Sequence, residues 1–471
     1  MATKKDLVEA YSFSRRRLVT AFVSGAPGGR EVEPARPGRT IVGGIALAVL
    51  VAAGAAIAGV FAPRTPDDWN QPGLVISKET GAAYVILESD PDELRPVINT
   101  TSAKLILGED SEPTLISQDT IDDQRIGDDI GIFGAPASVP TASLLISSGW
   151  TACTGDDRGI AVRVADQPDV TAATGQGVTV TSHGQLFVVA TGADGSGHLF
   201  PVPRQRAPGI DQTDVLLSQV QMPDHTNAVH VPRQWLTLFP VAAPLDWSSF
   251  DLDRFGEAPE ERLPGDAAAA NVGDLLETSD GDRLLVAYDG PVPLTDFAAY
   301  VYANIVLPDQ RLAKVVDVDR APSVGFGDDG FLRDTGWPAE PPEPLSTDPC
   351  VQLTAAHGQA PVAQLVGPGE DSAVSADVPE GVPDPLVDPG RGAYVLSGGW
   401  SGQAAGATPY LIDAKGRADP LVGAGAATQL GYAGVEAPVV PDSWVELFRC
   451  GVQLSQERAL QEPSDKDSTC A

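Results

Sequence analysis

The feature that most constrains the fold is an uninterrupted apolar stretch near the start of the chain. Residues 40–62 read TIVGGIALAVLVAAGAAIAGVFA, which is 23 residues without a charged side chain. As an α-helix this stretch would be about 34 Å long, at about 1.5 Å per residue, and could cross a bilayer. A cleaved signal peptide is the alternative, but 39 residues precede the stretch, and it exceeds the usual length of a signal-peptide apolar region. The sequence therefore predicts a single uncleaved transmembrane helix.

The charge on the two sides of this stretch is unequal. Residues 1–39 hold eight Lys or Arg and four acidic residues, a net charge of +4, whereas the whole chain of 471 residues has a net charge of −33. Because Lys and Arg stay on the cytoplasmic side, we expect a single-pass protein of the cell (inner) membrane with residues 63–471 extracytoplasmic. The acidic region would repel nucleic acid.

Residues 1–39 also carry apolar residues near one face of a helix: Leu7, Tyr11, Leu18 and Phe22. This pattern predicts a basic amphipathic cytoplasmic segment. Such a segment can lie on anionic lipid or dock on a partner protein, and the sequence leaves both interpretations open.

All four cysteines, Cys153, Cys350, Cys450 and Cys470, follow the apolar stretch. An even number of cysteines on the oxidising side of a membrane indicates disulfides. Three pairings are possible. We favour Cys153 with Cys350, which closes a very long loop, and Cys450 with Cys470, which ties down an acidic tail. No Cys or His spacing in the sequence is typical of a zinc site.

One phrase occurs twice, as VPRQWLTLF at 231–239 and as VPDSWVELF at 440–448. Each copy predicts a short amphipathic helix entered through a proline. Before each copy come an apolar run, a Gly/Asp turn and a proline followed by an aliphatic residue, and the same order recurs twice more. The four junctions are Pro96-Val97, Pro201-Val202, Pro293-Leu294 and Pro420-Leu421. We interpret them as four degenerate copies of one unit, whose unequal spacing argues against a regular solenoid.

The abundance of Gly (49) and Pro (41) favours short elements joined by turns. The predicted fold class is α+β: an N-terminal single transmembrane helix, then four degenerate hairpin-plus-helix repeat units flanking a central β-rich domain, in an elongated arrangement. The predicted boundaries are 1–39 cytoplasmic segment, 40–62 transmembrane helix, 63–117 first repeat, 118–183 first segment of the central β domain, 184–250 second repeat, 251–315 third repeat, 316–391 second segment of the central β domain, 392–455 fourth repeat and 456–471 acidic tail.

Several motifs, in one order along the whole chain, resemble the EccB family, the single-span membrane component of actinobacterial type VII (ESX) secretion systems. The resemblance rests on YSFSRRRLVTAF (11–22), AGVFAPR (58–64), GLVISKETGAAYVIL (73–87), RPVINTTSAKLILG (95–108), IGIFGAPASVP (130–140), SGWTACTG (148–155) and the terminal YLID…QLGY…VP. It implies four repeat domains around a central β domain outside the membrane, and a cysteine pair that bridges this domain at Cys153 and Cys350. Cys450 and Cys470 correspond to no feature of the family pattern. The implied partners are the FtsK/SpoIIIE-type ATPase EccC, the multi-span EccD, EccE and copies of the chain itself.

The residues give no support for catalysis. A P-loop requires GxxxxGK[ST], and none of the seven lysines follows that pattern. Each histidine is interpreted as a surface or turn residue, and the acidic runs at 279–283 and 327–330 as turns. Four tryptophans among apolar residues are predicted to pack in the core: Trp150, Trp235, Trp400 and Trp444.

We therefore expect no catalytic residues, no cofactor and no metal. The predicted function is a non-catalytic structural and assembly subunit of the type VII protein-secretion membrane complex, which anchors an exported domain that self-associates above the channel. The alternatives are a nucleotide hydrolase that supports secretion and a stand-alone anchored cell-envelope binding protein.

Overall fold

Four β-sheets in the computed structural model of the chain share one order of strands. In each sheet three consecutive strands form an antiparallel meander, a helix follows, and the next strand returns to pair parallel with the first. The predicted α+β class is thus confirmed. The structure describes residues 3–24, 44–45, 47–49, 51, 66, 68–88, 90–109, 111–207, 210–322, 324–325, 327, 334–370 and 378–465.

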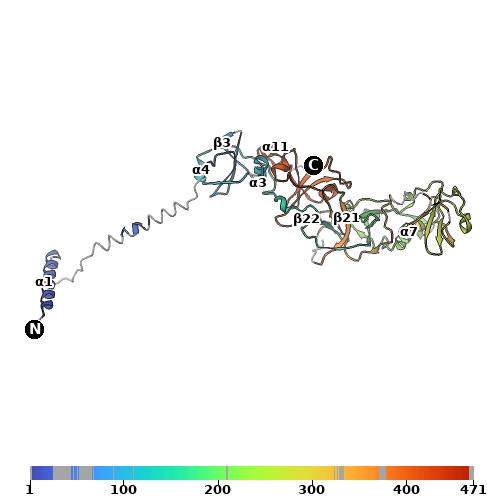
Figure 1. Cartoon of the computed structure of the whole chain (residues 1–471), viewed down its shortest axis with the longest axis horizontal. Coiled ribbons are helices and arrows are strands. Elements are labelled where there is room, and N and C mark those ends of the chain that lie inside the picture. Colours follow the sequence, from blue (N-terminus) through green and yellow to red (C-terminus); the bar gives the residue numbers. More distant parts are fainter. Residues whose placement is uncertain are drawn as a thin grey trace. The chain divides into compact units, whose positions relative to one another are not determined.

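The chain divides into two compact units, Met1–Pro66 and Asp67–Ala471. In the first unit, residues Lys4–Ser24 form helix α1 (Figure 1). The helix contains the apolar residues that predicted it, and the side chains of Leu7, Tyr11, Leu18 and Phe22 are exposed. Most of the predicted span over residues 40–62 lies outside the described residues. Among the residues that the structure describes, no helix is both long and apolar enough to cross a membrane.

The first and fourth sheets of the second unit have the same five-stranded topology. Their strand orders are β4-β1-β2-β3-β5 and β26-β23-β24-β25-β27. The first sheet contains β1 (Gly73–Ser77), β2 (Ala83–Leu87), β3 (Asp90–Pro96), β4 (Thr114–Ile116) and β5 (Arg125–Ile126). The fourth contains β23 (Ala393–Gly398), β24 (Thr408–Ile412), β25 (Arg417–Pro420), β26 (Val439–Pro441) and β27 (Arg449–Cys450).

The first and fourth sheets also share one hydrophobic core. Leu74 and Val85 are cross-strand neighbours in the first sheet, and Tyr394 and Leu411 hold the matching positions in the fourth. All four side chains belong to the same buried cluster. Cross-strand neighbours lie on the same sheet face, so corresponding faces of the two sheets meet in this core.

The second and third sheets are joined in the same way by another core. The second contains β9 (Gln176–Ser182), β10 (Gln185–Thr191), β11 (Gly197–Val202) and β14 (Val229–His230), and β19 (Glu343–Pro344) pairs with β9. The third contains β15 (Leu275–Thr278), β16 (Arg283–Val286), β17 (Pro291–Pro293) and β18 (Val315–Val318). A short separate hairpin is formed by β12 (Arg206–Ala207) and β13 (Ile210–Asp211).

The helix after each meander is short. These helices are α3 (Thr100–Leu107), α5 (Gln212–Gln219), α7 (Asp296–Asn304) and α9 (Ala426–Gln429). The first three begin at a capping side chain, because Asn99, Asp211 and Thr295 each accept a hydrogen bond from a backbone N–H of the first turn.

A six-stranded sheet, which we call the central sheet, has the order β22-β7-β6-β20-β21-β8. Its strands are β6 (Trp150–Cys153), β7 (Ala161–Val164), β8 (Val170–Ala172), β20 (Cys350–Thr354), β21 (Val362–Pro368) and β22 (Asp384–Val387). One buried cluster includes residues of this sheet together with residues of the second and fourth sheets.

Three of the predicted boundaries differ from the strand pairing. The boundary at 183/184 separates β9 from β10, which are antiparallel neighbours in one sheet. The boundary at 315/316 divides β18, and the boundary at 117/118 cuts off β5, which pairs with β3. The physical reason is that β9 has the same β-like composition as the strands of the central sheet, and composition does not reveal which strand pairs with which.

Candidate functional site: the disulfide-bonded central sheet

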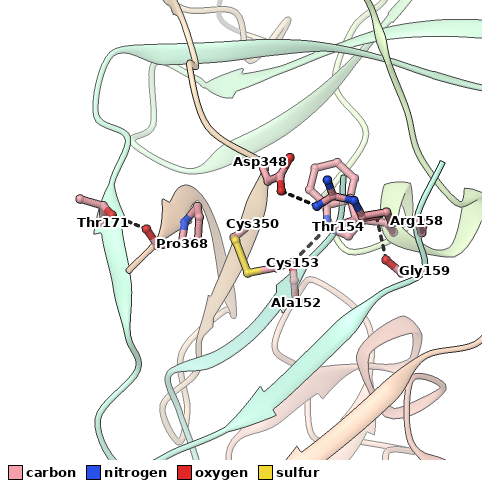
Figure 2. Close-up of a disulfide and its surroundings, with 10 residues drawn as sticks. Ala152, Cys153, Thr154, Arg158, Gly159, Thr171, Asp348, Cys350 and Pro368 are labelled. Atoms are coloured by element: carbon pink, nitrogen blue, oxygen red, sulfur yellow. Dashed lines mark hydrogen bonds and ion pairs between the residues drawn. A yellow bond between two sulfur atoms is a disulfide. The ribbon is translucent and has the colours of Figure 1, made fainter. Parts of the chain in front are cut away.

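A disulfide joins Cys153, the last residue of β6, to Cys350, the first residue of β20 (Figure 2). The two residues lie directly opposite each other in the antiparallel register, and their Cα atoms are 4.0 Å apart. Both side chains are buried, with Val366 as a neighbour. The first predicted pairing is confirmed, and because the cysteines are 197 residues apart, the bond closes a loop that contains both the second and the third sheets.

The second predicted pairing joins Cys450 to Cys470. Cys450 lies in β27, opposite Ala418 of β25. Residue 470 lies outside the described residues, so this pairing stays a prediction.

Polar contacts fix the loops beside the Cys153–Cys350 bond. An Arg158 Nη1 atom lies 2.7 Å from an Asp348 carboxylate oxygen, and both side chains are about one-third exposed. Thr154 donates its backbone N–H to Pro349 O at 3.0 Å and its hydroxyl to Gly159 O at 3.0 Å. Figure 2 shows Thr154, Arg158, Gly159 and Asp348 on one side of the disulfide. They connect the segment after β6 to the segment before β20, so the disulfide is one of several links between these two stretches of the chain.

The two copies of the VPxxWxxLF phrase form the short helices α6 (Arg233–Leu236) and α10 (Asp442–Val445). Pro232 and Pro441 occupy the N-cap positions, one residue before the predicted first turn. The Trp235 and Trp444 side chains are fully buried, and both belong to the cluster that contains the central sheet.

Hydrogen bonds and ring contacts hold these tryptophans in place. Trp235 donates its indole N–H to Ala152 O at 3.0 Å, so the first copy is fixed on strand β6 beside the disulfide. Trp444 donates to Leu238 O at 3.3 Å, a carbonyl of the first copy. Phe448 of the second copy packs edge-on against Trp150 of β6, with ring centroids 5.3 Å apart. The two copies therefore contact each other as well as the central sheet.

The predicted burial of tryptophans is confirmed for three of the four. Trp150, Trp235 and Trp444 have no exposed surface, whereas Trp400 is half-buried against the same cluster.

Three of the histidines form hydrogen-bonded pairs with aspartates. The pairs are His198 with Asp194 (3.0 Å), His225 with Asp214 (2.7 Å) and His230 with Asp157 (2.6 Å). Sequence reasoning missed these pairs, because the partners are 4, 11 and 73 residues apart and follow no recognisable spacing.

One of these pairs belongs to a group that has the right donors for a metal ion. One ligand atom each of Asp211, Asp214 and His225 lies within 4.8 Å of the others. The group is already engaged internally, because His225 Nδ1 is bonded to Asp214 and an Arg204 Nη1 atom lies 3.3 Å from Asp211. Burial alone would raise the pKa of the Asp211 carboxyl, but hydrogen bonds from Thr213 and the charge of Arg204 hold it below the usual value. These contacts stabilise the first turn of helix α5, for which Asp211 is the N-cap.

A cavity of about 1010 Å³ lies on the first sheet beside α3 and the short helix α11 (Gln456–Ala459). Its described lining includes the carboxylates of Asp68, Glu88 and Glu112, and no Lys or Arg. Such a surface repels polyanions, so this cavity is poorly suited to a nucleoside triphosphate.

Comparison with known proteins gives a consistent family. The family model for the type VII secretion system ESX-1 transport TM domain B (EccB) matches residues 1–465. ESX-1 secretion system ATPase EccB1 of Mycolicibacterium smegmatis (strain MKD8) is 36% identical over 115 residues, which cover 24% of this chain and 23% of the relative. ESX-2 secretion system ATPase EccB2 of Mycobacterium tuberculosis (strain ATCC 25618 / H37Rv) is 25% identical over 441 residues, which cover 82% of this chain and 81% of the relative. The match spans less than a third of the first two relatives.

Two solved structures have the same fold. A chain of an intact ESX-5 inner membrane complex aligns with a TM-score of 0.62 at 21% identity, covering 100% of this chain and 98% of that one. The EccB3 dimer from the ESX-3 core complex also aligns with a TM-score of 0.62, at 19% identity, covering 83% of this chain and 100% of that one.

Proposed function

Because this chain belongs to the EccB family of type VII secretion components, we propose that it is a non-catalytic structural and assembly subunit of a type VII secretion membrane complex. Residues 40–62 anchor it in the cell membrane, with residues 1–39 in the cytoplasm and residues 63–471 outside. The outer region associates with copies of itself above the channel. The anchor and the cytoplasmic helix contact the ATPase EccC, the multi-span EccD and EccE.

The observation that carries this proposal is the position of the two VPxxWxxLF copies. Their tryptophans, Trp235 and Trp444, are fully buried and donate hydrogen bonds to backbone carbonyls. A repeated motif that supplied a binding or catalytic site would present its side chains to a ligand. Here the motif packs between sheets and connects them, as expected of a protein with a structural role.

The common strand order of the four meander sheets supports a further element of the proposal, that one ancestral unit was duplicated. Each proline of the four predicted junctions, Pro96, Pro201, Pro293 and Pro420, lies at or next to the end of the third strand of its sheet. We infer four degenerate repeat units around the central sheet. Such units present several similar surfaces, which suits assembly with other subunits.

A nucleotide hydrolase is the strongest alternative, since the curated relatives carry the name ATPase. The sequence has no P-loop, and the described lining of the cavity on the first sheet is acidic. Phosphoryl transfer requires cations or backbone amides arranged around the phosphates, so we favour the structural role.

The assembly proposal is tested by extracting membranes that contain the tagged full-length chain with a mild detergent. We expect it to co-migrate on a native gel with EccC and EccD. A tagged single-span protein of unrelated sequence from the same membranes is the control. Migration of the chain alone would contradict the proposal and favour a stand-alone envelope protein.

The absence of catalysis is tested separately with the purified full-length chain in detergent. We expect ATP turnover no faster than in a parallel preparation from cells that lack the chain. Turnover that follows the chain through successive purification steps would support the hydrolase.

A further inference from the structure

Asp419, in strand β25 of the fourth sheet, is a fully buried carboxyl that the proposed function does not use. Its Oδ1 atom accepts a hydrogen bond from the Val452 backbone N–H at 2.7 Å. Its Oδ2 atom is buried and has no hydrogen-bond partner among the described residues. A buried carboxylate with one unpaired oxygen is costly, so the presence of an acid here requires an explanation.

The matching positions in the second and third sheets show that packing does not require an acid, whereas the first sheet holds Arg95 there, one-third exposed and paired with Glu93. Asp419 is the cross-strand partner of Leu411. Phe200 in the second sheet and Val292 in the third hold the same place relative to their meanders, and both are fully buried. In two sheets this place therefore accepts a fully buried apolar side chain, and in the fourth sheet it holds a fully buried ionisable one.

Asp419 contacts the C-terminal segment, which we define as residues 449–461, containing β27 and α11. Besides the bond to Val452, the backbone of Gly451 comes so close that an added Cβ atom would lie 2.1 Å from Asp419 Oδ1. The carboxyl group is thus in direct contact with the C-terminal segment at the point where it leaves β27.

The C-terminal segment connects the fourth sheet to the first. On one side Gly451 N–H donates to Ala418 O at 2.9 Å. On the other side Gln456 donates to Ile106 O of helix α3 at 3.3 Å, and Gly131 N–H donates to Gln461 O at 3.1 Å. Helices α11 and α3 lie side by side in Figure 1. A change in how this segment docks would therefore loosen the joint between the two sheets.

Other charged and titratable groups lie on the same strand as Asp419 and on the elements next to it. They are Arg417 on the same strand, Asp413 in the preceding turn, Arg449 on β27, and the stacked pair Tyr394 and Tyr432 in the shared core. Burial is the main cause that raises the pKa of Asp419, to about 7, and the Asp413 charge adds to it, while the Val452 hydrogen bond and Arg417 act in the opposite direction. Arg417 also donates to Gly134 O, so its charge is shared with a second acceptor.

We propose that Asp419 is a proton-dependent latch, which holds the C-terminal segment on the core shared by the first and fourth sheets when protonated and releases it when ionised. Opening of the segment hydrates the carboxyl group and returns it to its ordinary acidity. Ionisation therefore favours the open state, and rising pH weakens the joint. This inference goes beyond the assembly role proposed above and does not depend on it.

The test is hydrogen–deuterium exchange of the full-length chain in detergent at pH 5.5 and pH 8.5, with labelling times scaled to the intrinsic exchange rate at each pH. The pKa of Asp419 is about 7 when the segment is docked and returns to 3.8 when the segment opens. The equilibrium constant for opening of residues 449–461 should therefore rise about thirty-fold from pH 5.5 to pH 8.5. Peptides from β15 to β16, which contain no histidine, should not respond. The variant Asp419→Asn, which keeps the shape and removes the titration, should abolish the response.

The matched control is Asp317→Asn, an exposed acid on β18, which should keep the wild-type response. If Asp419→Asn does not fold, Asp419→Val, the residue type at the matching position of the third sheet, replaces it. A wild-type segment that exchanges equally at both pH values would overturn the proposal. So would a response that survives in a folded position-419 variant, or one that spreads equally to β15–β16.

Discussion

Removal of the Cys153–Cys350 disulfide gives a quantitative test of how the central sheet is held. The change is Cys153→Ala together with Cys350→Ala. Alanine is preferable to serine because Cys350 is fully buried, and a hydroxyl group there would be left without a partner. The substitution removes none of the side chains that make the neighbouring polar contacts, such as Arg158 with Asp348.

The magnitude follows from the length of the loop. A cross-link between residues 197 apart lowers the entropy of the unfolded chain by about 18 cal/mol/K, which corresponds to about 5 kcal/mol at 25 °C. The unit Asp67–Ala471 has about 400 residues, so at about 2.1 cal/mol/K per residue its unfolding entropy is about 0.85 kcal/mol/K. Loss of the bond should therefore lower the Tm by about 6 °C if the unit unfolds as one.

The assay is thermal unfolding of the full-length chain followed by tryptophan fluorescence, since buried Trp150 and Trp235 report on this sheet. Wild-type protein unfolded in a reducing agent should shift at least as far as the double variant. A double variant whose Tm lies within about 1 °C of the oxidised wild type would refute the loop-closure argument. It would mean that the unfolded chain keeps enough residual strand pairing to restrain the loop without the disulfide, or that packing in the folded state improves when the sulfur atoms are removed.

Three further changes probe other regions of the fold by the same thermal assay. Trp444→Phe should lower stability by about 2–4 kcal/mol, because it replaces a fully buried ring with a smaller one and leaves the Leu238 carbonyl without its donor. Trp400→Phe, at a half-buried site, should cost less. Equal losses would contradict the interpretation that Trp444 connects the sheets. Gly451→Ala should cost about 1–3 kcal/mol because its Cβ meets Asp419, while Gly434→Ala, with nothing within 4 Å, should be nearly neutral. The pKa of Asp419 is about 7 in the folded state and 3.8 in the unfolded state, so the folded state binds the extra proton. The stability that this proton gives below about pH 4 should fall by about 4 kcal/mol as the pH rises through 7. If the difference in unfolding free energy between wild type and Asp419→Asn does not change with pH, this reasoning is wrong.

The sequence allowed prediction of the local pattern of the meander sheets. The four Pro-aliphatic junctions lie at or next to strand ends, because proline lacks a backbone N–H and is tolerated there and at sheet edges. The predicted hairpin is one strand short, since each unit has a meander of three strands. The two Trp phrases were correctly interpreted as short helices with buried rings. These features depend on residues close together in the chain, and sequence patterns report such features well.

Long-range pairing could not be predicted in the same way. The sharing of one core by the first and fourth sheets, and of another by the second and third, leaves no periodic signal in the sequence. The strand β9 was assigned to the wrong sheet for the same reason. Nor could the His–Asp pairs or the buried state of Asp419 be read from the sequence, because an aspartate before a proline is usually typical of a turn.

The shared core of the first and fourth sheets has a consequence for how the protein is made. Residues 73–126 emerge early in synthesis, but the residues that complete their hydrophobic core, such as Leu411 and Leu454, come hundreds of residues later. The first sheet must therefore keep apolar surface uncovered until nearly the last stretch of the chain has been made. During that interval the uncovered surface is open to aggregation, and chaperones would be needed to protect it.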